Sequence, residues 1–539
     1  MFNPNTSLKR IIFLINFLPF LFSCNADQNG KNLKNDFYMN EKHRPQFHFS
    51  PEAHWMNDPN GMVFFEGEYH LFYQHYPDST IWGPMHWGHA VSSDLIHWEH
   101  LPIAIYPDSL GYIFSGSAVY DENNTSGLGA NGTGPLIAIF THHDVNQEKA
   151  GSTTFQYQSM AFSNDKGRSW EKYEGNPVLP NPGIKNFRDP KVMWYEPEKK
   201  WIMTLAADDR IKFYSSSDFK SWEETGEFGA EHGGHGGVWE CPDLFPMPVE
   251  ETGETKWVLL VSINPGGPNG GSAAQYFVGD FDGKKFTLDV GFAPHVTLGN
   301  AKWVDHGKDN YAGVTWSNIS KEDGRRLFIG WMSNWLYAQV VPTEVWRSAN
   351  TLPRNLTLHY AANQFELRSN PVKELVSLEG EIKKLEPGLY EGEKTLSAFA
   401  NHPLQKIALK FKNPTSGSIV LRLSNSKNEY IDFGYNSDST SYFVDRSKAG
   451  DSTFSNDFAG KHTALASYTK NEIDMLIYLD VSSLELFADS GRTVMTQIFF
   501  PSEPFNQLTI IEGSNSIELI EGTTTDLTRI WPDKADAAH

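Results

Sequence analysis

The sequence predicts an all-β protein, built as a five-bladed β-propeller followed by a C-terminal β-sandwich. Short alternating runs, broken about every ten residues by Gly, Pro, Asn or Asp, extend from Gln46 to about Leu358. No helical periodicity persists in that region, and a similar strand pattern returns from Ile407 onward. Many short strands joined by turn residues are typical of propellers and sandwiches.

A degenerate repeat indicates the propeller. In each copy an Asp in a turn is followed closely by an aromatic residue. The copies are Asp94 with Trp98, Asp165 with Trp170, Asp218 with Trp222 and, more weakly, Asp282 with Phe286. Their spacing of about 60 residues fits a four-stranded unit with its loops, and the region holds about five such units. The alternative is chance recurrence of an Asp-turn-Trp pattern in a β protein rich in aromatic residues.

Two hairpins are expected inside the propeller. In the first, Glu66-Gly67-Glu68 turns the chain between two aromatic strands. In the second, a Glu-Pro-Glu-Lys turn separates the strands 192–195 and 201–204.

The domain limits follow from changes in this pattern. The propeller is predicted at 45–358 and a linker at 359–385, because the residues around Phe365 to Ser377 are polar and interrupted by Pro. About 150 residues of further strands predict the sandwich at 386–533.

The first 23 residues have the features of an export signal. Lys9 and Arg10 precede an apolar run, 11–22, that is too short to span a membrane. Leu21-Phe22-Ser23-Cys24 resembles a lipobox, which predicts a lipoprotein signal peptide at 1–23, lipidation of Cys24 and a flexible tether at 24–44. The expected location is the outer membrane of a bacterium, facing the periplasm or the cell surface. The alternative is an ordinary secretory signal.

Composition excludes some classes of function. The formal net charge of −21 repels phosphate backbones, so nucleic acid is not an expected partner. The two cysteines cannot form a disulfide framework. Aromatic residues make up 14% of the chain, which suits both strands and the apolar faces of sugars.

Three acidic residues lie in unusual local sequences. Asp58 belongs to the turn sequence Asn57-Asp58-Pro59-Asn60-Gly61, which could be only a β-turn, but large apolar residues precede it. Asp189 follows Arg188, a pair that is most often solvated on a surface. Glu240 lies between Trp239 and Cys241, an apolar setting expected to raise the pKa of its carboxyl group.

Two carboxyl groups in different environments can hydrolyse a glycosidic bond. One attacks the anomeric carbon while the other donates a proton to the leaving oxygen. The third carboxylate can hydrogen-bond ring hydroxyls and support the positive charge of the transition state.

Neither a metal nor a cofactor is expected. The runs His142-His143-Asp144 and His232-Gly233-Gly234-His235 contain potential ligands, but no helical face or Cys cluster accompanies them. No Gly-rich loop opens a helix to hold phosphates.

Several ordered segments are similar to the motifs of glycoside hydrolase family 32, which contains invertases, inulinases and levanases. The segments are 54–61, 71–75, 114–117, 187–190, 239–243, 330–335, 342–347 and, in the sandwich, 442–447.

The resemblance implies a five-bladed propeller with a sandwich and a retaining mechanism. It implies Asp58 as nucleophile, Glu240 as acid/base and Asp189 as transition-state stabiliser. It also implies a terminal fructose subsite lined by Asn57, Gln74, Trp82, Ser115, Arg188 and Trp335.

The leading hypothesis is therefore a lipid-anchored β-fructosidase acting on fructans such as levan or inulin, and on sucrose. Alternatives are a fructosyltransferase, an endo-acting levanase or inulinase, and a non-catalytic fructan-binding lipoprotein. Exo or endo action, linkage preference and oligomeric state stay open from sequence.

Overall fold

The computed structural model describes residues 39–130, 132–399, 403–466, 471–511 and 516–531. The predicted signal peptide, Cys24 and most of the predicted tether lie outside these residues, as do the last two residues of the predicted sandwich.

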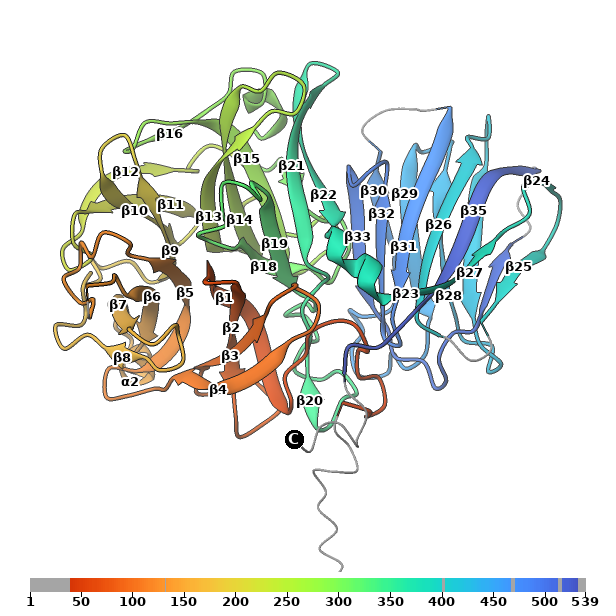
Figure 1. Cartoon of the computed structure of the whole chain (residues 1–539). Helices are drawn as coiled ribbons and strands as arrows, with labels where there is room; N and C mark the ends of the chain where they lie inside the picture. Colours follow the sequence, from red (N-terminus) through yellow and green to blue (C-terminus); the bar gives the residue numbers. More distant parts are fainter. Residues whose placement is uncertain (1–38, 131, 400–402, 467–470, 512–515, 532–539) are drawn as a thin grey trace, which may run out of the picture. The chain divides into compact units, whose positions relative to one another are not determined.

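The first part of the described chain forms five successive sheets, coloured red to green in Figure 1, which are antiparallel except for the short parallel pair of β20 with β1. The first contains β20 (Trp346–Arg347), β1 (His54–Phe65), β2 (Glu68–Tyr76), β3 (His86–Ser92) and β4 (Glu99–Ile105). The second contains β5 (Tyr112–Tyr120), β6 (Leu136–His143), β7 (Gln156–Ser163) and β8 (Glu171–Lys172). The third contains β9 (Phe187–Tyr195), β10 (Lys200–Ala207), β11 (Arg210–Ser216) and β12 (Glu223–Phe228).

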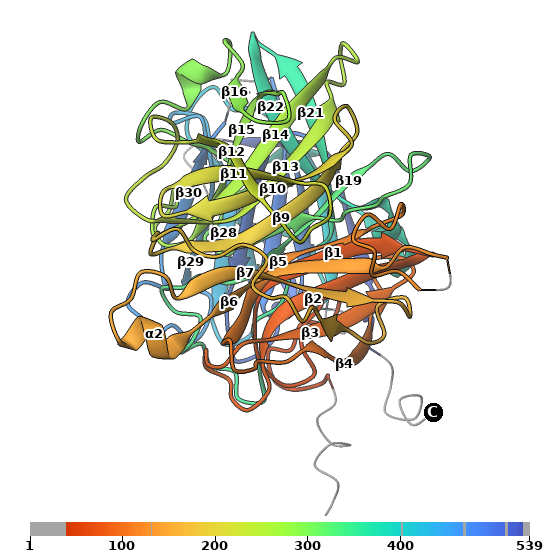
Figure 2. The same cartoon turned by 90° about the vertical axis from the view of Figure 1, so that its left-hand side faces the viewer.

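The remaining two sheets complete the predicted propeller. The fourth contains β13 (Val238–Pro248), β14 (Thr255–Asn264), β15 (Ala273–Phe281), β16 (Phe286–Leu288) and β17 (Lys302–Trp303). The fifth contains β18 (Tyr311–Thr315), β19 (Arg326–Trp331), β21 (Arg354–Ala361) and β22 (Gln364–Pro371). The first strands β1, β5, β9, β13 and β18 contact one another across the sheets, and Figure 2 shows β9, β5 and β1 side by side. These strands therefore line the propeller axis.

The Asp repeat marks the turn between the third and fourth strands of a blade. The Asp94 carboxylate accepts hydrogen bonds from the backbone N–H groups of Ile96 and His97, between β3 and β4. The corresponding turns of the next three blades have the same contact, in which a backbone N–H donates a hydrogen bond to Asp165, Asp218 or Asp282. The structure confirms the repeat, and it confirms both predicted hairpins through the pairs Phe65 with Glu68 and Tyr195 with Lys200.

The sandwich, blue in Figure 1, consists of two further sheets. One contains β23 (Glu379–Lys384), β24 (Gly388–Tyr390), β26 (Gln405–Lys412), β31 (Glu472–Leu479), β32 (Ser483–Ala488), β33 (Thr493–Ile498) and β35 (Ile517–Leu527). The other contains β25 (Lys394–Ala398), β27 (Ser418–Ser424), β28 (Tyr430–Asn436), β29 (Ser441–Lys448), β30 (Lys461–Leu465) and β34 (Gln507–Ile510). Alternate apolar residues of both sheets, such as Leu421 and Ile477, form one buried core.

Helix is scarce in the described residues. It is limited there to α2 (Val145–Lys149) and the 3-10 helices η1 (Ala293–His295) and η2 (Lys373–Leu378). None of these is long and apolar enough to cross a membrane.

The structure corrects the predicted linker at 359–385. Its first half contains β22, which pairs with β21 and buries Phe365 and Leu367 in the propeller core. Its second half contains η2 and β23, and β23 already belongs to the sandwich. Only two apolar residues carry the alternation here, which is too short a pattern to predict a strand from sequence. The predicted tether at 24–44 also ends early, because Met39 and Arg44 are buried.

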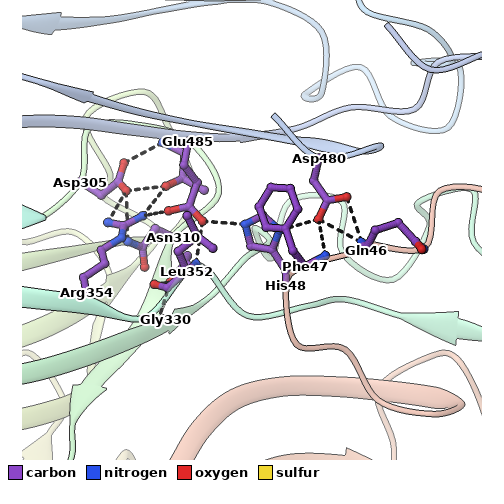
Figure 3. A network of polar contacts seen from close by, with 12 residues as sticks. Gln46, Phe47, His48, Asp305, Asn310, Gly330, Leu352, Arg354, Asp480 and Glu485 are labelled. Carbon is purple, nitrogen blue, oxygen red and sulfur yellow. Dashed lines mark hydrogen bonds and ion pairs between the residues drawn. The ribbon is translucent and has the colours of Figure 1, made fainter. Parts of the chain in front are cut away.

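Buried polar contacts join the propeller, the sandwich and the segment before β1 (Figure 3). His48 lies between Asp480 and Glu485 of the sandwich, with contacts of 2.7 and 2.9 Å. The other Glu485 oxygen accepts from Arg354 of β21 at 2.5 Å, and Arg354 also donates to Asp305. Residues far apart in the chain therefore share one buried ionic network.

Candidate active site

The first strand of every blade is interrupted near the propeller axis. The ladder between β1 and β2 shifts around Asp58, and that between β5 and β6 shifts around Ser115. Equivalent shifts occur at Asp189 in β9, after Glu240 in β13 and after Tyr311 in β18. A β-bulge re-aims a side chain out of the regular alternation. The five bulges bring polar side chains from five strands to the axis.

Side chains from the bulges of the first four blades line a cavity of about 400 Å³, and Tyr311 of the fifth lies behind Glu240. All nine residues implied by the family resemblance line it: Asn57, Asp58, Gln74, Trp82, Ser115, Arg188, Asp189, Glu240 and Trp335. A larger cavity of about 940 Å³ lies on the sandwich and contains none of them. The structure therefore brings the candidate residues together at one place, at a size suited to a small ligand.

Each carboxylate oxygen of Asp58 accepts a hydrogen bond from a neighbouring polar side chain. Asn57 Nδ2 donates to Oδ1 at 2.9 Å, and Ser115 Oγ donates to Oδ2 at 2.8 Å. Asn57 is fixed in turn by the Trp55 indole N–H at 2.7 Å. Burial and the charge of Glu240 raise the pKa of Asp58, while the two donors act in the opposite direction.

Asp189 has a left-handed backbone, with φ of 66°. Its Oδ2 accepts the backbone N–H of Cys241 at 3.0 Å. Burial and the charges of Glu240 and Asp58 raise the pKa of Asp189 to about 7, against the opposing effect of Arg188. The three carboxylates therefore interact electrostatically within one cavity.

Glu240 does not have the apolar surroundings that its sequence neighbours predict. Arg188 donates to one of its oxygens and the Tyr311 hydroxyl donates to the other. The Trp239 side chain lies in the propeller core, where its N–H donates to Gly234 O at 2.9 Å. The expected apolar setting is therefore wrong, because adjacent residues on a strand point to opposite faces.

Two residues near the carboxylates escaped the sequence analysis as functional groups. Tyr311 lies outside all of the segments that resemble family motifs. Cys241 Sγ lies 3.6 Å from Asp189 Oδ2 and 3.7 Å from Asp58 Oδ2. Burial raises the pKa of both the Cys241 thiol and the Tyr311 hydroxyl well above their usual ranges. Both groups are therefore protonated donors toward the acids.

Aromatic rings form much of the remaining wall. Trp335 stacks on Trp55, with ring centroids 5.8 Å apart. On another side, Phe114 lies in edge contact with Trp82 and stacks on His143 at 4.3 Å. Such rings can cover the apolar face of a sugar.

The two His runs have structural partners. His142 contacts Ser159 Oγ at 2.7 Å, and His143 contacts Glu148 at 3.0 Å while lining the cavity. His235 contacts Asp209 at 3.1 Å. Within the described part of the chain, no group of three His, Cys, Asp or Glu residues is placed to hold a metal ion.

Paired carboxylates with distinct hydrogen-bond partners, set in an aromatic cavity on a propeller axis, define a glycoside hydrolase. Comparison with known proteins identifies the family. Residues 48–371 match the N-terminal domain of glycosyl hydrolases family 32, and residues 372–529 match the C-terminal domain of that family. The chain belongs to glycosyl hydrolase family 32 and is a glycoside hydrolase of the β-fructofuranosidase type.

Individual relatives agree over nearly the whole chain. A levanase of Bacillus subtilis is 47% identical over 499 residues, covering 92% of this chain and 72% of its own length. An extracellular exo-inulinase of Aspergillus niger is 38% identical, covering 92% and 96%. The solved exo-inulinase of Aspergillus awamori superimposes with a TM-score of 0.84 at 34% identity, covering 92% of this chain and 100% of its own. A β-fructofuranosidase of Schwanniomyces occidentalis complexed with fructosyl-erythritol gives 0.80 at 32%, covering 91% and 99%.

Proposed function

We propose that the protein is a retaining β-fructosidase that removes terminal β-D-fructosyl units from fructans such as levan and inulin, and from sucrose. The observation that carries this function is the convergence of Asp58, Asp189 and Glu240 on one cavity, each with a different set of donors. Fructose as the sugar is supported by the relatives named as levanase, exo-inulinase and β-fructofuranosidase.

In the first step, the Asp58 carboxylate attacks the anomeric carbon C2 and forms a fructosyl ester. Glu240 donates its proton to the glycosidic oxygen as the bond between that oxygen and C2 breaks. Asn57 and Ser115 fix the two Asp58 oxygens, so the nucleophile is oriented before the substrate binds.

In the second step, water replaces the departed sugar. Ionised Glu240 takes a proton from the water, whose oxygen attacks C2 and releases Asp58 as a carboxylate. Two inversions at C2 leave the β configuration. Asp189, oriented by the Cys241 N–H, holds hydroxyls of the fructosyl ring and supports its positive charge.

The starting state needs Glu240 protonated and Asp58 ionised. The charge of ionised Glu240 is one cause of the raised pKa of Asp58. Protonation of Glu240 removes that charge and favours ionised Asp58. Protonated Glu240, the form needed as acid, and ionised Asp58, the form needed as nucleophile, therefore favour each other.

Product analysis tests this function. The purified protein is expected to release fructose from levan, inulin and sucrose, and the first product seen by NMR is expected to be β-fructose. Initial α-fructose would contradict the retaining mechanism, a ladder of oligosaccharides would indicate endo action, and transfer to sugar would indicate a fructosyltransferase. Binding without turnover would indicate the non-catalytic alternative.

Export with a lipid on Cys24 is the location we propose. It is supported by the basic and apolar segments before Leu21-Phe22-Ser23-Cys24. Several acyl chains hold a protein stably at a membrane, where one chain does not. An enzyme held in this way acts on fructan outside the cytoplasm.

A further inference from the structure

One arginine of the sandwich reaches into the propeller. Arg446 of β29 is buried, and its Nε donates to Phe458 O at 2.7 Å within the sandwich. Its Nη1 donates to Asp309 Oδ2 at 2.5 Å and its Nη2 donates to the Tyr337 hydroxyl at 2.8 Å. Tyr337 donates in turn to the other Asp309 oxygen. One guanidinium therefore holds two groups of the propeller.

Asp309 lies two residues before Tyr311, which donates to Glu240. Tyr311 itself pairs with Trp331 of β19, but the ladder is broken directly after it, so the blade does not hold the strand beyond Tyr311 in regular register. Ala312 has a left-handed backbone there, with φ of 54°. Asp309 is the nearest charged anchor before this break, held by Arg446 and by the backbone N–H of Ile498, so a shift of Asp309 is expected to move the Tyr311 hydroxyl.

Tyr337, the other propeller residue that Arg446 contacts, lies on the loop that carries Trp335. Asn334 of this loop donates to Lys308 O at 2.7 Å, so the loop is also tied to the residue before Asp309. The contacts of Arg446 thus reach two segments next to the site: one carries Tyr311, which donates to Glu240, and the other carries Trp335, which lines the cavity.

Stability alone gives a weak reason for this arrangement. Both side chains of the Arg446–Asp309 pair are fully buried. Removing two charges from water costs free energy that offsets much of their attraction, so a buried pair often adds little net stability. Its geometry, however, is strict, since four hydrogen bonds fix the guanidinium plane.

We propose that Arg446 is a positioning residue for Glu240, acting through Asp309 and Tyr311. This role rests on the proposed acid/base function of Glu240. The sandwich thereby holds the proton donor of the propeller in place.

Arg446→Lys tests the role because it keeps the charge but cannot make the same set of hydrogen bonds. Turnover of levan is expected to fall by roughly tenfold, part of what a positioned acid contributes. Turnover of fructosyl fluoride, whose leaving group needs no proton, is expected to fall much less. The basic limb of the pH profile on levan is expected to move to higher pH, because ionised Glu240 loses a hydrogen-bond donor.

Arg492→Lys is the matched control. Arg492 of the sandwich pairs with Glu366 of β22 at 2.6 Å, both nearly buried, away from the cavity. The Arg492→Lys variant is expected to change stability. It is not expected to change the ratio of levan turnover to fructosyl fluoride turnover, or the basic limb of the pH profile.

Thermal unfolding establishes which variants are folded. A folded Arg446→Lys protein with the wild-type ratio and basic limb would overturn the role of Arg446. If Arg446→Lys does not fold, Tyr337→Phe decides by the same two readouts, with smaller shifts expected in the same directions. A wild-type protein that releases no fructose would instead overturn the proposed function.

Discussion

At the scale of single residues, the main feature of the cavity is that three carboxyl groups, those of Asp58, Asp189 and Glu240, lie close together in it. Asp58 and Asp189 are buried, and burial together with the charge of Glu240 raises the pKa of both. Arg188 supplies the positive charge, and its pKa is raised by Glu240 and Asp189 despite burial. Each acid also has its own hydrogen-bond donors: Asn57 and Ser115 for Asp58, the Cys241 N–H for Asp189, and Arg188 with Tyr311 for Glu240.

Asp58→Asn is expected to lower turnover of levan by several orders of magnitude, because the amide cannot attack C2. The folded state is expected to be as stable as the wild type or more so at neutral pH, since one buried charge leaves a crowded cluster. Fructose release and thermal unfolding measure the two effects. Near-normal turnover by folded protein would contradict the nucleophile assignment.

Ser115→Ala is expected to move the acidic limb of the pH profile to higher pH. The hydroxyl donates to Asp58 Oδ2 at 2.8 Å and lowers its pKa, so its loss raises the pH at which the nucleophile becomes protonated. Ser117→Ala, on the same strand as Ser115, is the control, because that hydroxyl donates to Pro190 O of β9 and not to Asp58. An unchanged limb in Ser115→Ala would show that Asp58 does not set it.

At the scale of elements, the site depends on bulges in the first strands. A regular strand would alternate its side chains between two faces, and consecutive residues could not converge on the axis. Left-handed residues at Asp189, Cys241 and Ala312 accompany three of the five bulges. A left-handed backbone at a residue other than Gly is unfavourable in free energy, and the packing of the surrounding blades stabilises it here.

Gly116→Ala tests the bulge of β5. A Cβ at this position would lie 2.1 Å from Ile139 O, which is backbone of β6 and cannot turn aside. Unfolding free energy is expected to fall by about 1–3 kcal/mol, and activity is expected to fall because neighbouring Ser115 moves. Gly460→Ala, whose added Cβ meets only His462 at 3.5 Å, is the control. Equal stability of the two variants in denaturant would contradict this account.

At the scale of the whole molecule, buried ionic contacts join the propeller to the sandwich. Burial lowers the pKa of His48, but the hydrogen bonds and charges of Asp480 and Glu485 outweigh burial and raise it to about 9. The folded state therefore binds a proton more tightly than the unfolded chain, whose His has a pKa of about 6.5.

Stability is expected to fall as pH rises from about 6.5 to 9. The contribution of His48 is complete below 6.5 and is lost as pH passes its folded pKa, by up to about 3 kcal/mol. His48→Gln is expected to be less stable at pH 6 and to lose this slope in denaturant titrations. His100→Gln is the control, because burial lowers the pKa of His100 to about 3. The same slope in wild type and His48→Gln would contradict the linkage.

Cys24→Ser is expected to stop lipoprotein processing or to release soluble protein after another cleavage. Catalytic activity of the purified protein is expected to be unchanged, because the substitution precedes the first strand by many residues. Metabolic labelling with a palmitate analogue measures the lipid directly. A wild-type protein that takes up no label would leave ordinary secretion as the explanation.

Local pattern was enough to predict the strands, the five blades and the Asp turns, because each is encoded within a few consecutive residues. The family resemblance located the residues that line the cavity, including Asp58, Asp189 and Glu240. Both kinds of information are present in the linear chain. The predicted linker failed because Phe365 and Leu367 are only two apolar residues, and the core that buries them is shared with strands of the fourth blade, such as β15 through Tyr276.

Tertiary structure alone decided the environment of each acid. Glu240 has apolar neighbours in sequence, yet its carboxylate meets Arg188, 52 residues away, and Tyr311, 71 residues away. Arg446 reaches Asp309 across 137 residues. A side chain's partners depend on bulges that turn it and on sheets that pack around it, and neither is a property of its sequence neighbours. The sequence determined which groups are present, and the packing of distant strands decided what each group touches.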